Sequence, residues 1–573
     1  MVFHIFKKIT RSNKITTHSI DLDEIFMDSI NVSGFDHQQF EGMIERSITK
    51  RTFFAVAILS VVVGVIFLVQ MIHLQLVNGV SYLAKSENNR LQHSPIFADR
   101  GVIFDRNGKE LAWNVASSEG EPFAVREYIP AGGFAHLIGY VGYPTKDNSG
   151  FFWQHEIIGK SGVEKKMNDL LAGVNGQKII EVDAHQKPLN ENMISLPQSG
   201  TNVTLTIDAL IQQSMYDGIK ELAETRGFEG GAGVMMNVQT GEILALTSYP
   251  EYDLNILSHG DDRATIAKYA TDNRRVYLNR ALAGLYTPGS IVKPYLALAA
   301  LQEKIITPQT TVYSSGQVEI PNRYDPTKPQ VFRDWKKGGH GTTDVYHAIA
   351  ESVNTFFYAI GGGYKNQEGL GIDRIDTYLE KFGLNQKTGI DLDGETIGNI
   401  PSMAWKAKTF PKDATWRLGD TYNSSIGQFG YQVTTLEMVR AVAAIANRGK
   451  LVQPFVFLNP RSQTSAPTII TGIDDHWYDV IHDAMRQTVT KGTAQAINVP
   501  YVAAAAKTGT AQVGPRNAFM NSWTTGFFPL ENPKYAFVVV MEKAASTNQT
   551  GATFVMNKVF SAIQQENPNF FIQ

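Results

Sequence analysis

The sequence predicts an α+β protein: an antiparallel sheet flanked by helices, standing on a smaller β-rich pedestal and preceded by one transmembrane helix. Three observations lead to this prediction. Strand-like stretches near both ends of residues 227–573 enclose a long stretch with helical periodicity, an order typical of an antiparallel sheet covered by helices. Residues 74–226 carry short strand patterns and turn signals, and an uncharged apolar segment stands near the N-terminus. At 573 residues the chain exceeds the size of one hydrophobic core, so several domains are expected.

The apolar segment runs from Thr52 to Ile72, 21 residues without a charge. At about 1.5 Å per residue such a helix crosses the roughly 30 Å hydrocarbon layer of a membrane. A cleaved signal peptide has a shorter apolar core and a small-residue cleavage site, and neither occurs here. Arg46, Lys50 and Arg51 precede the segment, so the positive-inside rule predicts a cytoplasmic tail over residues 1–51 and an exported remainder. The alternative is a buried core helix, which seldom reaches this length without caps.

The predicted domains are a tail over 1–51, a transmembrane helix over 52–73, the pedestal over 74–226 and a larger domain over 227–573. In the pedestal, "RGVIFDRNGKELAW" places an Asn-Gly turn between alternating apolar residues, a strong signal for a β-hairpin. The larger domain begins with a second hairpin pattern, "GAGVMMNVQTGEILALTSY". It ends with three strand patterns, "YVAAAAKTGTAQ", "NSWTTGFFP" and "YAFVVVMEKA", and a final helix.

Composition excludes several classes of function. The 52 basic and 55 acidic side chains give a net charge of -3, which offers no electrostatic footprint for nucleic acid. The absence of cysteine excludes disulfides, thiolate metal sites and cysteine nucleophiles. The sequence contains no H-E-x-x-H and no G-x-G-x-x-G motif, so it has neither of those signatures of zinc or dinucleotide binding.

The stretch "YTPGSIVKPY" contains the first candidate catalytic pair, Ser290 and Lys293. Pro294 is tolerated only in or beside the first turn of a helix, so Ser290 is expected close to a helix N-terminus. Residues three apart share a helix face, so the hydroxyl and the amine can meet. The apolar sequence that follows predicts burial, and burial lowers the pKa of a lysine until it can accept the serine proton. The same spacing occurs at Ser47, in the predicted tail, so the motif alone has little specificity.

Serine–lysine acyl-transfer enzymes need two further elements, S-x-N and K-[ST]-G. Ser352 and Asn354, in "AESVNTFF", form the S-x-N that lies between the other two motifs in chain order. Residues two apart do not share a helix face, so both side chains reach one cleft only if one helix ends there and another begins. Simple capping of such helices by serine and asparagine is the alternative interpretation.

The K-T-G pattern occurs twice. The copy at 387–389 lies in a turn that follows a helical pattern, whereas the copy at 507–509 follows a run of small residues typical of an inner strand. Only a strand can present backbone groups along a cleft, with its glycine allowing close approach. Lys507 would also bring a positive charge for a substrate carboxylate and would favour a neutral Lys293.

Together these motifs resemble those of penicillin-binding proteins and serine β-lactamases. The residues that carry the resemblance are Ser290, Lys293, Ser352, Asn354, Lys507, Thr508 and Gly509. Further stretches, among them "DRGVIFDRNGKELA", "GKSGVEKKMNDLLAGVNG" and "SIGQFGYQVTTLEM", resemble monofunctional class B penicillin-binding proteins. "FRDWKKGGHGTTD" and "YTPGSIVKPY" are most like the elongation type, penicillin-binding protein 2. The fold that this resemblance implies is the penicillin-binding, β-lactamase-like transpeptidase domain on its pedestal.

The resemblance implies a peptidoglycan D,D-transpeptidase that cross-links stem peptides and is a target of β-lactams. Ser290 would attack the penultimate D-Ala carbonyl with Lys293 as general base, and Ser352 would relay the proton to the leaving amine. A carboxypeptidase side activity is compatible with the same acyl-enzyme. No metal or organic cofactor is expected.

The same resemblance assigns the binding residues. Asn354 would hold the stem-peptide amide, while Lys507, Thr508 and Thr510 would hold the terminal carboxylate, with Gly509 between them. The backbone N–H groups of Ser290 and Thr510 would form the oxyanion hole.

The expected partners are stem peptides, glycan strands derived from lipid II, and the membrane. The pedestal does not look like a glycosyltransferase, so a SEDS-type membrane glycosyltransferase and elongation-complex proteins are expected to assemble with the chain. Between the strand-like stretch "ELAWN" and the stretch "REYIPAGG", only residues 115–125 remain. Members of the resembled family usually have a sizeable head subdomain at this position.

Three alternatives stay open at this point. The first is a division-type class B transpeptidase. The second is a β-lactamase, for which Glu395 and Asn399 have an E-x-x-x-N spacing. The third is a membrane-anchored β-lactam sensor, although the tail shows no recognisable effector pattern.

Overall fold

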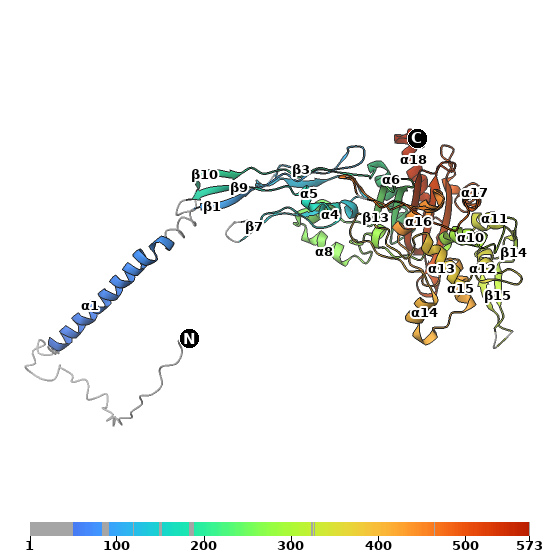
Figure 1. Ribbon diagram of the computed structural model, residues 1–573, viewed down its shortest axis with the longest axis horizontal. Coiled ribbons are helices and arrows are strands. Elements are labelled where there is room, and N and C mark those ends of the chain that lie inside the picture. Colours follow the sequence, from blue (N-terminus) through green and yellow to red (C-terminus); the bar gives the residue numbers. More distant parts are fainter. Residues whose placement is uncertain are drawn as a thin grey trace, which may run out of the picture. The chain divides into compact units, whose positions relative to one another are not determined.

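The computed structural model describes residues 50–82, 91–117, 120–147, 152–182, 188–322, 325, 327–462 and 464–571, and Figure 1 shows the chain as a ribbon. The chain divides into two compact units, Met1–Arg90 and Leu91–Gln573. Residues 1–49 of the predicted tail, with the chance S-x-x-K serine at position 47, lie outside the described residues, whereas Lys50 and Arg51 already belong to the first helix.

The first unit contains helix α1 (Lys50–Ile72), which continues into a short π-helical turn, His73–Val77. Within the helical segment Lys50–Val77, an 18-residue stretch has a mean hydropathy of 2.9, and none of that stretch is buried. The helix predicted from the sequence is confirmed, and by length and composition it can cross a membrane.

The pedestal is built on two sheets of the second unit. One is an antiparallel three-stranded sheet in the order β1-β9-β10. The other has five short strands in the order β19-β11-β2-β3-β4. The strands are β1 (Leu91–Ile96), β2 (Ile103–Phe104), β3 (Glu110–Val115), β4 (Val125–Tyr128), β9 (Gly176–Val182), β10 (Pro188–Ser195), β11 (Val203–Leu205) and β19 (Phe457–Asn459).

The predicted pedestal hairpin is present, with β2 and β3 antiparallel and Gly108 at φ +84° in the turn. One strand of this sheet was not expected: β19 belongs to the C-terminal half of the chain and pairs antiparallel with β11. The pairing ties the pedestal to the larger domain through backbone hydrogen bonds. The predicted boundary between residues 226 and 227 stays a prediction.

A buried ion cluster fixes the pedestal core. Glu164 accepts from Arg100 Nε at 2.6 Å and from Arg126 Nε at 2.8 Å, and all three side chains are at most 1% exposed. Buried charges are tolerated only when paired and hydrogen-bonded. The cluster therefore joins helix α4 (Gly162–Lys166), which carries Glu164, to strand β4, which carries Arg126.

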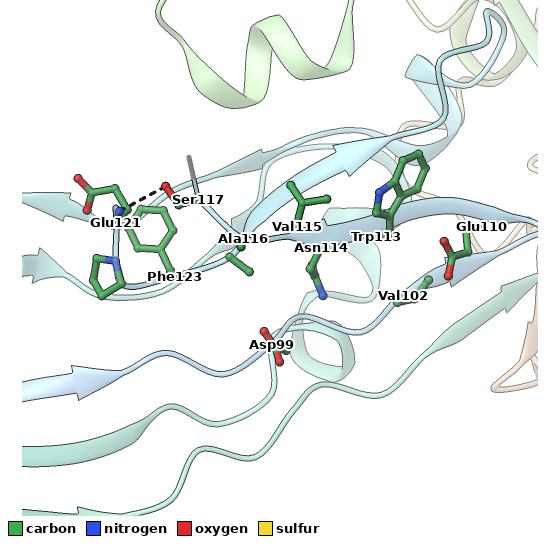
Figure 2. A pocket seen from close by; sticks show the side chains of 12 residues that line it. Asp99, Val102, Glu110, Trp113, Asn114, Val115, Ala116, Ser117, Glu121 and Phe123 are labelled. Carbon is green, nitrogen blue, oxygen red and sulfur yellow. Dashed lines mark hydrogen bonds between the residues drawn. The ribbon is translucent and has the colours of Figure 1, made fainter. Parts of the chain in front are cut away.

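A hollow of about 690 Å³ opens in the pedestal where β3 leads into β4. Figure 2 shows its lining, which includes Trp113, Asn114 and Phe123 with Asp99 at its edge. The hollow lies at the short connection where relatives are expected to carry a head subdomain. None of the predicted site residues lines it.

The larger domain is organised by a five-stranded antiparallel sheet in the order β13-β12-β23-β22-β21. Its strands are β12 (Gly230–Asn237), β13 (Ile243–Tyr249), β21 (Ala505–Val513), β22 (Phe519–Phe528) and β23 (Tyr535–Ala545). The predicted hairpin and the three predicted C-terminal strands are thus confirmed, and β12 joins the two groups by pairing with β23. Strand β21, which carries the second K-T-G, lies at the edge of the sheet.

Helices cover both faces of this sheet because its strands are apolar on both sides. Along β23, Val538 and Val540 belong to one hydrophobic cluster, and Val539 and Met541 to another. The second cluster includes helices α6 (Ala209–Arg226) and α18 (Thr553–Glu566), which pack against each other (Figure 1). The first includes α10 (Lys293–Gln302), α16 (Thr435–Ala446) and α17 (His476–Thr490).

The other elements are short. The remaining helices are α3 (Ala135–Ile138), α5 (Asn168–Leu171), α7 (Leu254–His259), α8 (Arg263–Thr271), α9 (Arg280–Ala283), α11 (Val345–Ala350), α12 (Asn354–Gly362), α13 (Ile372–Lys381), α14 (Met403–Thr409) and α15 (Leu418–Ser425). The remaining strands are β5 (Val141–Gly142), β6 (Thr145–Lys146), β7 (Phe152–Gln154), β8 (Ile158–Gly159), β14 (Val312–Ser314), β15 (Gln317–Ile320), β16 (Gln330–Arg333), β17 (Gly341–Thr343), β18 (Lys450–Leu451) and β20 (Thr468–Ile469).

Candidate active site

Ser290 lies in a 3₁₀ turn, η4 (Gly289–Val292), which leads directly into helix α10. The position that the prolines predicted, close to a helix N-terminus, is confirmed. The turn packs against the edge strand β21. Gly289 has φ +59°, and a Cβ there would stand 3.0 Å from the Thr510 carbonyl oxygen. A glycine is therefore needed for the turn to approach the strand.

Lys293 is the first residue of α10 and is fully buried. Its Nζ donates to the Ser352 carbonyl oxygen at 2.8 Å, to the Ser352 Oγ at 3.3 Å and to the Asn354 Oδ1 at 2.7 Å. Burial lowers the pKa of Lys293 to about 7, against the opposing effect of the Asp334 carboxylate. A large fraction of this lysine is therefore neutral near pH 7, with a lone pair free to accept a proton.

Within the described part of the chain, no hydrogen bond joins Lys293 Nζ to the Ser290 hydroxyl. The three donors of a protonated lysine are all used by Ser352 and Asn354. Proton transfer from Ser290 thus requires the neutral amine, and catalytic hydrogen bonds often tighten only when substrate is bound.

The S-x-N motif connects two helices, α11 and α12, as its spacing predicted. Ser352 has φ +57°, the left-handed region that non-glycine residues seldom adopt. The N-cap of α12 is Val353, which makes no side-chain cap. The Ser352 and Asn354 side chains bind Lys293 instead, so the alternative of simple capping is wrong for both.

Lys507 is the second buried amine of the site. Its Nζ donates to Ser352 Oγ at 2.9 Å and to the Thr508 carbonyl oxygen at 2.7 Å. Burial, and then the charge of Lys293, hold the pKa of Lys507 well below its usual range. Lys507 was expected to help lower the pKa of Lys293, but burial is the main cause of that lowering. The repulsion between the two amines lowers the pKa of Lys507 instead. The Ser352 hydroxyl lies between the two amines, where it can carry a proton.

The rest of the K-T-G-T stretch follows along β21. A Cβ on Gly509 would stand 2.8 Å from the Pro288 carbonyl oxygen, so the glycine lets the strand pass the turn that carries Ser290. Thr508 is half-buried and its hydroxyl contacts that of Thr493, whereas Thr510 is exposed. Because β21 is an edge strand, its outward backbone groups are available to an extended peptide.

These residues share one cleft of about 1090 Å³. Six of the eight predicted residues line it: Ser290, Ser352, Asn354, Thr508, Gly509 and Thr510. Lys293 and Lys507 contact Ser352 from behind the lining. Other walls come from residues 331–335, 423–429 and 549–553. The structure therefore brings together all residues that the three motifs predicted.

The other K-T-G copy lies apart from the cleft. Its Thr388 donates through the backbone N–H and the hydroxyl to Glu395 Oε1, at 2.6 and 2.5 Å. Glu395 is therefore occupied in a turn and does not line the cleft. This removes the carboxylate on which the β-lactamase alternative depended.

A clamp that the three sequence motifs did not predict surrounds the S-x-N motif. Asp334 Oδ2 accepts from the Thr355 N–H at 2.9 Å and from its hydroxyl at 3.1 Å, and so caps helix α12. His340 Nε2 lies 3.3 Å from Asp334 Oδ1, a contact too poorly aligned for a hydrogen bond. His340 Nδ1 lies 2.6 Å from Glu351 Oε2. The Asp334–His340 segment thus holds the residues on either side of Ser352 and Asn354.

The stretch "FRDWKKGGHGTTD" was the available signal for this clamp. It supported the resemblance to the elongation type, but its charged residues had no assigned role. Trp335 adds to the contact, donating from Nε1 to the Glu351 carbonyl oxygen at 3.1 Å and packing edge-on against His340. Among the described residues, no group of three or more histidines and acids could hold a metal ion.

Asp334→Ala is expected to weaken the site without removing any predicted catalytic group. Loss of the cap should cost about 0.5–2 kcal/mol of stability. Misplacement of Ser352 and Asn354 should lower the second-order rate of penicillin acylation by about 10- to 100-fold. Stopped-flow acylation and thermal unfolding measure the two effects. Asp344→Ala is the matched control, because Asp344 caps the preceding helix α11 and should lower stability alone. Equal acylation rates in both variants would contradict the clamp.

This fold and this site define the class of serine–lysine acyl-transfer enzymes. The family model of the penicillin-binding protein transpeptidase domain matches residues 231–565. The model of the penicillin-binding protein dimerisation domain matches residues 119–205. The chain belongs to the penicillin-binding protein transpeptidase family.

Relatives of this chain include MrdA transpeptidases and penicillin-binding protein 2. The peptidoglycan D,D-transpeptidase MrdA of Salmonella typhimurium is 30% identical over 90% of this chain and 96% of the relative. Penicillin-binding protein 2 of Helicobacter pylori, solved in complex with MreC, matches with 27% identity and a TM-score of 0.67 over 83% of this chain and 99% of the other. That of Pseudomonas aeruginosa, in complex with WCK 5153, matches with 29% identity and a TM-score of 0.66 over 83% and 97%. The predicted similarity to penicillin-binding protein 2 is confirmed.

Proposed function

We propose that this chain is the peptidoglycan D,D-transpeptidase of cell-wall elongation and that it cross-links stem peptides through an acyl-enzyme on Ser290. One observation carries the proposal: two buried lysines with lowered pKa values converge on Ser352 Oγ beside the cleft that Ser290 lines. Such an arrangement is suited to moving a proton from a nucleophile to a leaving amine. The elongation-type relatives support the same function.

In the acylation step, neutral Lys293 takes the proton of Ser290 as Oγ attacks the carbonyl carbon of the penultimate D-Ala. The new C–O bond forms, and the C–N bond to the terminal D-Ala then breaks. Lys293 passes the proton through Ser352 to the leaving amine. An acceptor amine next attacks the ester, forming the cross-link amide, and one of its protons returns to Ser290 Oγ.

The remaining site residues bind the donor peptide and stabilise the negative charge that develops on the attacked carbonyl oxygen. The N–H groups of Ser290 and Thr510 form the oxyanion hole, an effect commonly worth about 3–4 kcal/mol. Asn354 holds the stem-peptide amide. Lys507, with Thr508 and Thr510, holds the terminal carboxylate, and the arriving negative charge raises the pKa of Lys507 so that it binds as an ammonium. Gly509 keeps the strand close to the nucleophile.

The sequence also supports a proposal for the membrane location, orientation and partners of the enzyme. We propose that α1 anchors it in the cytoplasmic membrane with residues 1–51 inside and the pedestal, 74–226, and transpeptidase domain, 227–573, outside. Basic residues before the helix support this orientation. We further propose lipid II-derived glycan strands as substrate, β-lactams as inhibitors, and a SEDS-type glycosyltransferase with elongation-complex proteins as partners. The complex of the H. pylori relative with MreC supports the last of these.

Mass spectrometry of the full-length chain treated with a fluorescent penicillin tests the proposal. One covalent adduct is expected, on the peptide that contains Ser290, and its hydrolysis should be slow. A pentapeptide ending in D-Ala-D-Ala should release D-Ala and pass its acyl group to an added amine. An adduct at any other residue would sink the assignment of the nucleophile. Rapid penicillin hydrolysis would indicate a β-lactamase, and an adduct without D-Ala release would indicate a sensor.

A further inference from the structure

The cleft carries one exposed charge that the proposed mechanism does not use. Among the described residues that line it, only Arg333 and Asp334 are formally charged. The Asp334 side chain is fully buried and engaged in the clamp. Arg333 is exposed. Because burial shifts both site lysines toward their neutral forms, the guanidinium is the permanent positive charge that this surface presents to a ligand.

Arg333 is held firmly at its backbone and left unpaired at its guanidinium. It is the last residue of β16 and pairs with Gln317 of β15, and its carbonyl oxygen accepts from the Tyr358 hydroxyl at 3.2 Å. Within the described part of the chain, no ion pair or hydrogen bond engages its side chain. The neighbouring Trp335, 60% exposed, also lines the cleft. A fixed cation beside an apolar ring is suited to a planar anion on an aliphatic chain.

The chemistry of cross-linking indicates which substrate anion would bind Arg333. The terminal carboxylate of the donor peptide is assigned to the K-T-G residues on β21, whereas Arg333 lies on the wall made by β16 and α12. The acceptor must arrive as a neutral amine, which a bare guanidinium does not attract. An acceptor that carries a carboxylate on the same carbon as its amine differs from one that presents the amine alone. A bidentate pair between the arginine and this carboxylate would also fix the position of the neighbouring amine. The positive charge would also favour the unprotonated amine.

We propose that Arg333 binds the carboxylate that stands on the same carbon as the attacking amine of the acceptor. The acceptor residue of the stem peptide is then a diamino dicarboxylic acid of the 2,6-diaminopimelate type, not lysine. This inference rests on the transpeptidase function proposed above. In the step itself the amine nitrogen bonds to the acyl carbon, the ester bond to Ser290 Oγ breaks and one amine proton returns to that oxygen. Arg333 stays protonated throughout.

The experiment compares three acceptors with the full-length chain in detergent and one pentapeptide donor. The acceptors are a tripeptide with diaminopimelate in third place, the same tripeptide with the carboxylate next to the reacting amine amidated, and its lysine analogue. Rates are normalised to the fraction of each sample that takes up a fluorescent penicillin. The wild type should prefer the free carboxylate by about 10- to 100-fold in kcat/KM, the range expected of charge-assisted hydrogen bonds.

Arg333→Gln should remove this preference, bringing the three acceptors to within about 3-fold by raising KM for the first. Arg333→Lys should restore part of it, because a point charge replaces the bidentate fork. Lys337→Gln is the matched control, because Lys337 is an exposed cation four residues beyond Arg333 that does not line the cleft, and this variant should retain the wild-type preference.

Two results would overturn the inference: equal use of all acceptors by the wild type, or an undiminished preference in Arg333→Gln. Either can be told apart from a failure of the proposed function, in which the same samples would form no acyl-enzyme at Ser290.

Discussion

Ser290→Ala is expected to abolish covalent labelling by a penicillin and to lower D,D-transpeptidation by about 10⁴-fold or more, the loss typical when a nucleophile is removed. Without Oγ no ester can form, and the neighbouring lysines and the oxyanion hole have no acyl group to act on. The fold should persist, because the change deletes one oxygen from a half-buried side chain. Fluorescent labelling, D-Ala release and thermal unfolding measure the three expectations.

Ser47→Ala is the natural control, since Ser47 begins the other S-x-x-K of the chain. It should label like the wild type. Persistent labelling of Ser290→Ala would exclude this residue as the nucleophile, and loss of labelling together with a lowered melting temperature would show a folding defect instead.

Lys293→Arg is expected to lower penicillin acylation by about 10²- to 10⁴-fold, the usual range for a general base. Arginine can keep the positive charge and some of the hydrogen bonds to Ser352 and Asn354, but it does not lose its proton. The variant therefore separates the role of a base from that of a charge. A near-normal rate would show that Lys293 acts only as a cation.

The pH dependence of acylation gives a second measure of the same group. Burial lowers the pKa of Lys293 to about 7, so the lysine is protonated and inactive as a base below that pH and neutral above it. The wild-type acylation rate should rise with pH through about 7 and then level off, and this inflection should vanish in Lys293→Arg. Lys387→Arg, in the K-T-G copy outside the cleft, should keep the wild-type profile. A rate that falls as pH rises through 7 would contradict the proposed base.

Much of the fold could be predicted from the sequence because its signals are local. The Asn107-Gly108 turn and the alternating apolar residues beside it predicted the β2–β3 hairpin, which the structure contains. The uncharged segment from Thr52 predicted α1. Strand β19 escaped prediction because it is three residues long and its partner β11 lies some 250 residues earlier in the chain. A short strand is specified by its partner more than by its own sequence.

The same contrast between local signals and long-range contacts applies to the candidate site. The order and spacing of the three motifs are typical of one kind of catalytic site, so their residues could be predicted: Ser290, Lys293, Ser352, Asn354 and residues 507–510. The cap that Asp334 provides for α12 could not, since Val353 occupies the N-cap position and the capping carboxylate comes from about 20 residues earlier. The φ of +57° at Ser352 also has no local sequence signal, because serine has no preference for that conformation.

The order and spacing of a serine, two lysines and a glycine were enough to indicate the kind of chemistry without coordinates. How these groups act together depends on the tertiary fold. Burial sets the pKa of both lysines, and the edge position of β21 opens its backbone to a peptide. The cleft also brings Arg333 to the site, although it is 43 residues from Ser290 in the chain. Solvation and proximity depend on contacts between distant segments, and these exist only in the folded chain.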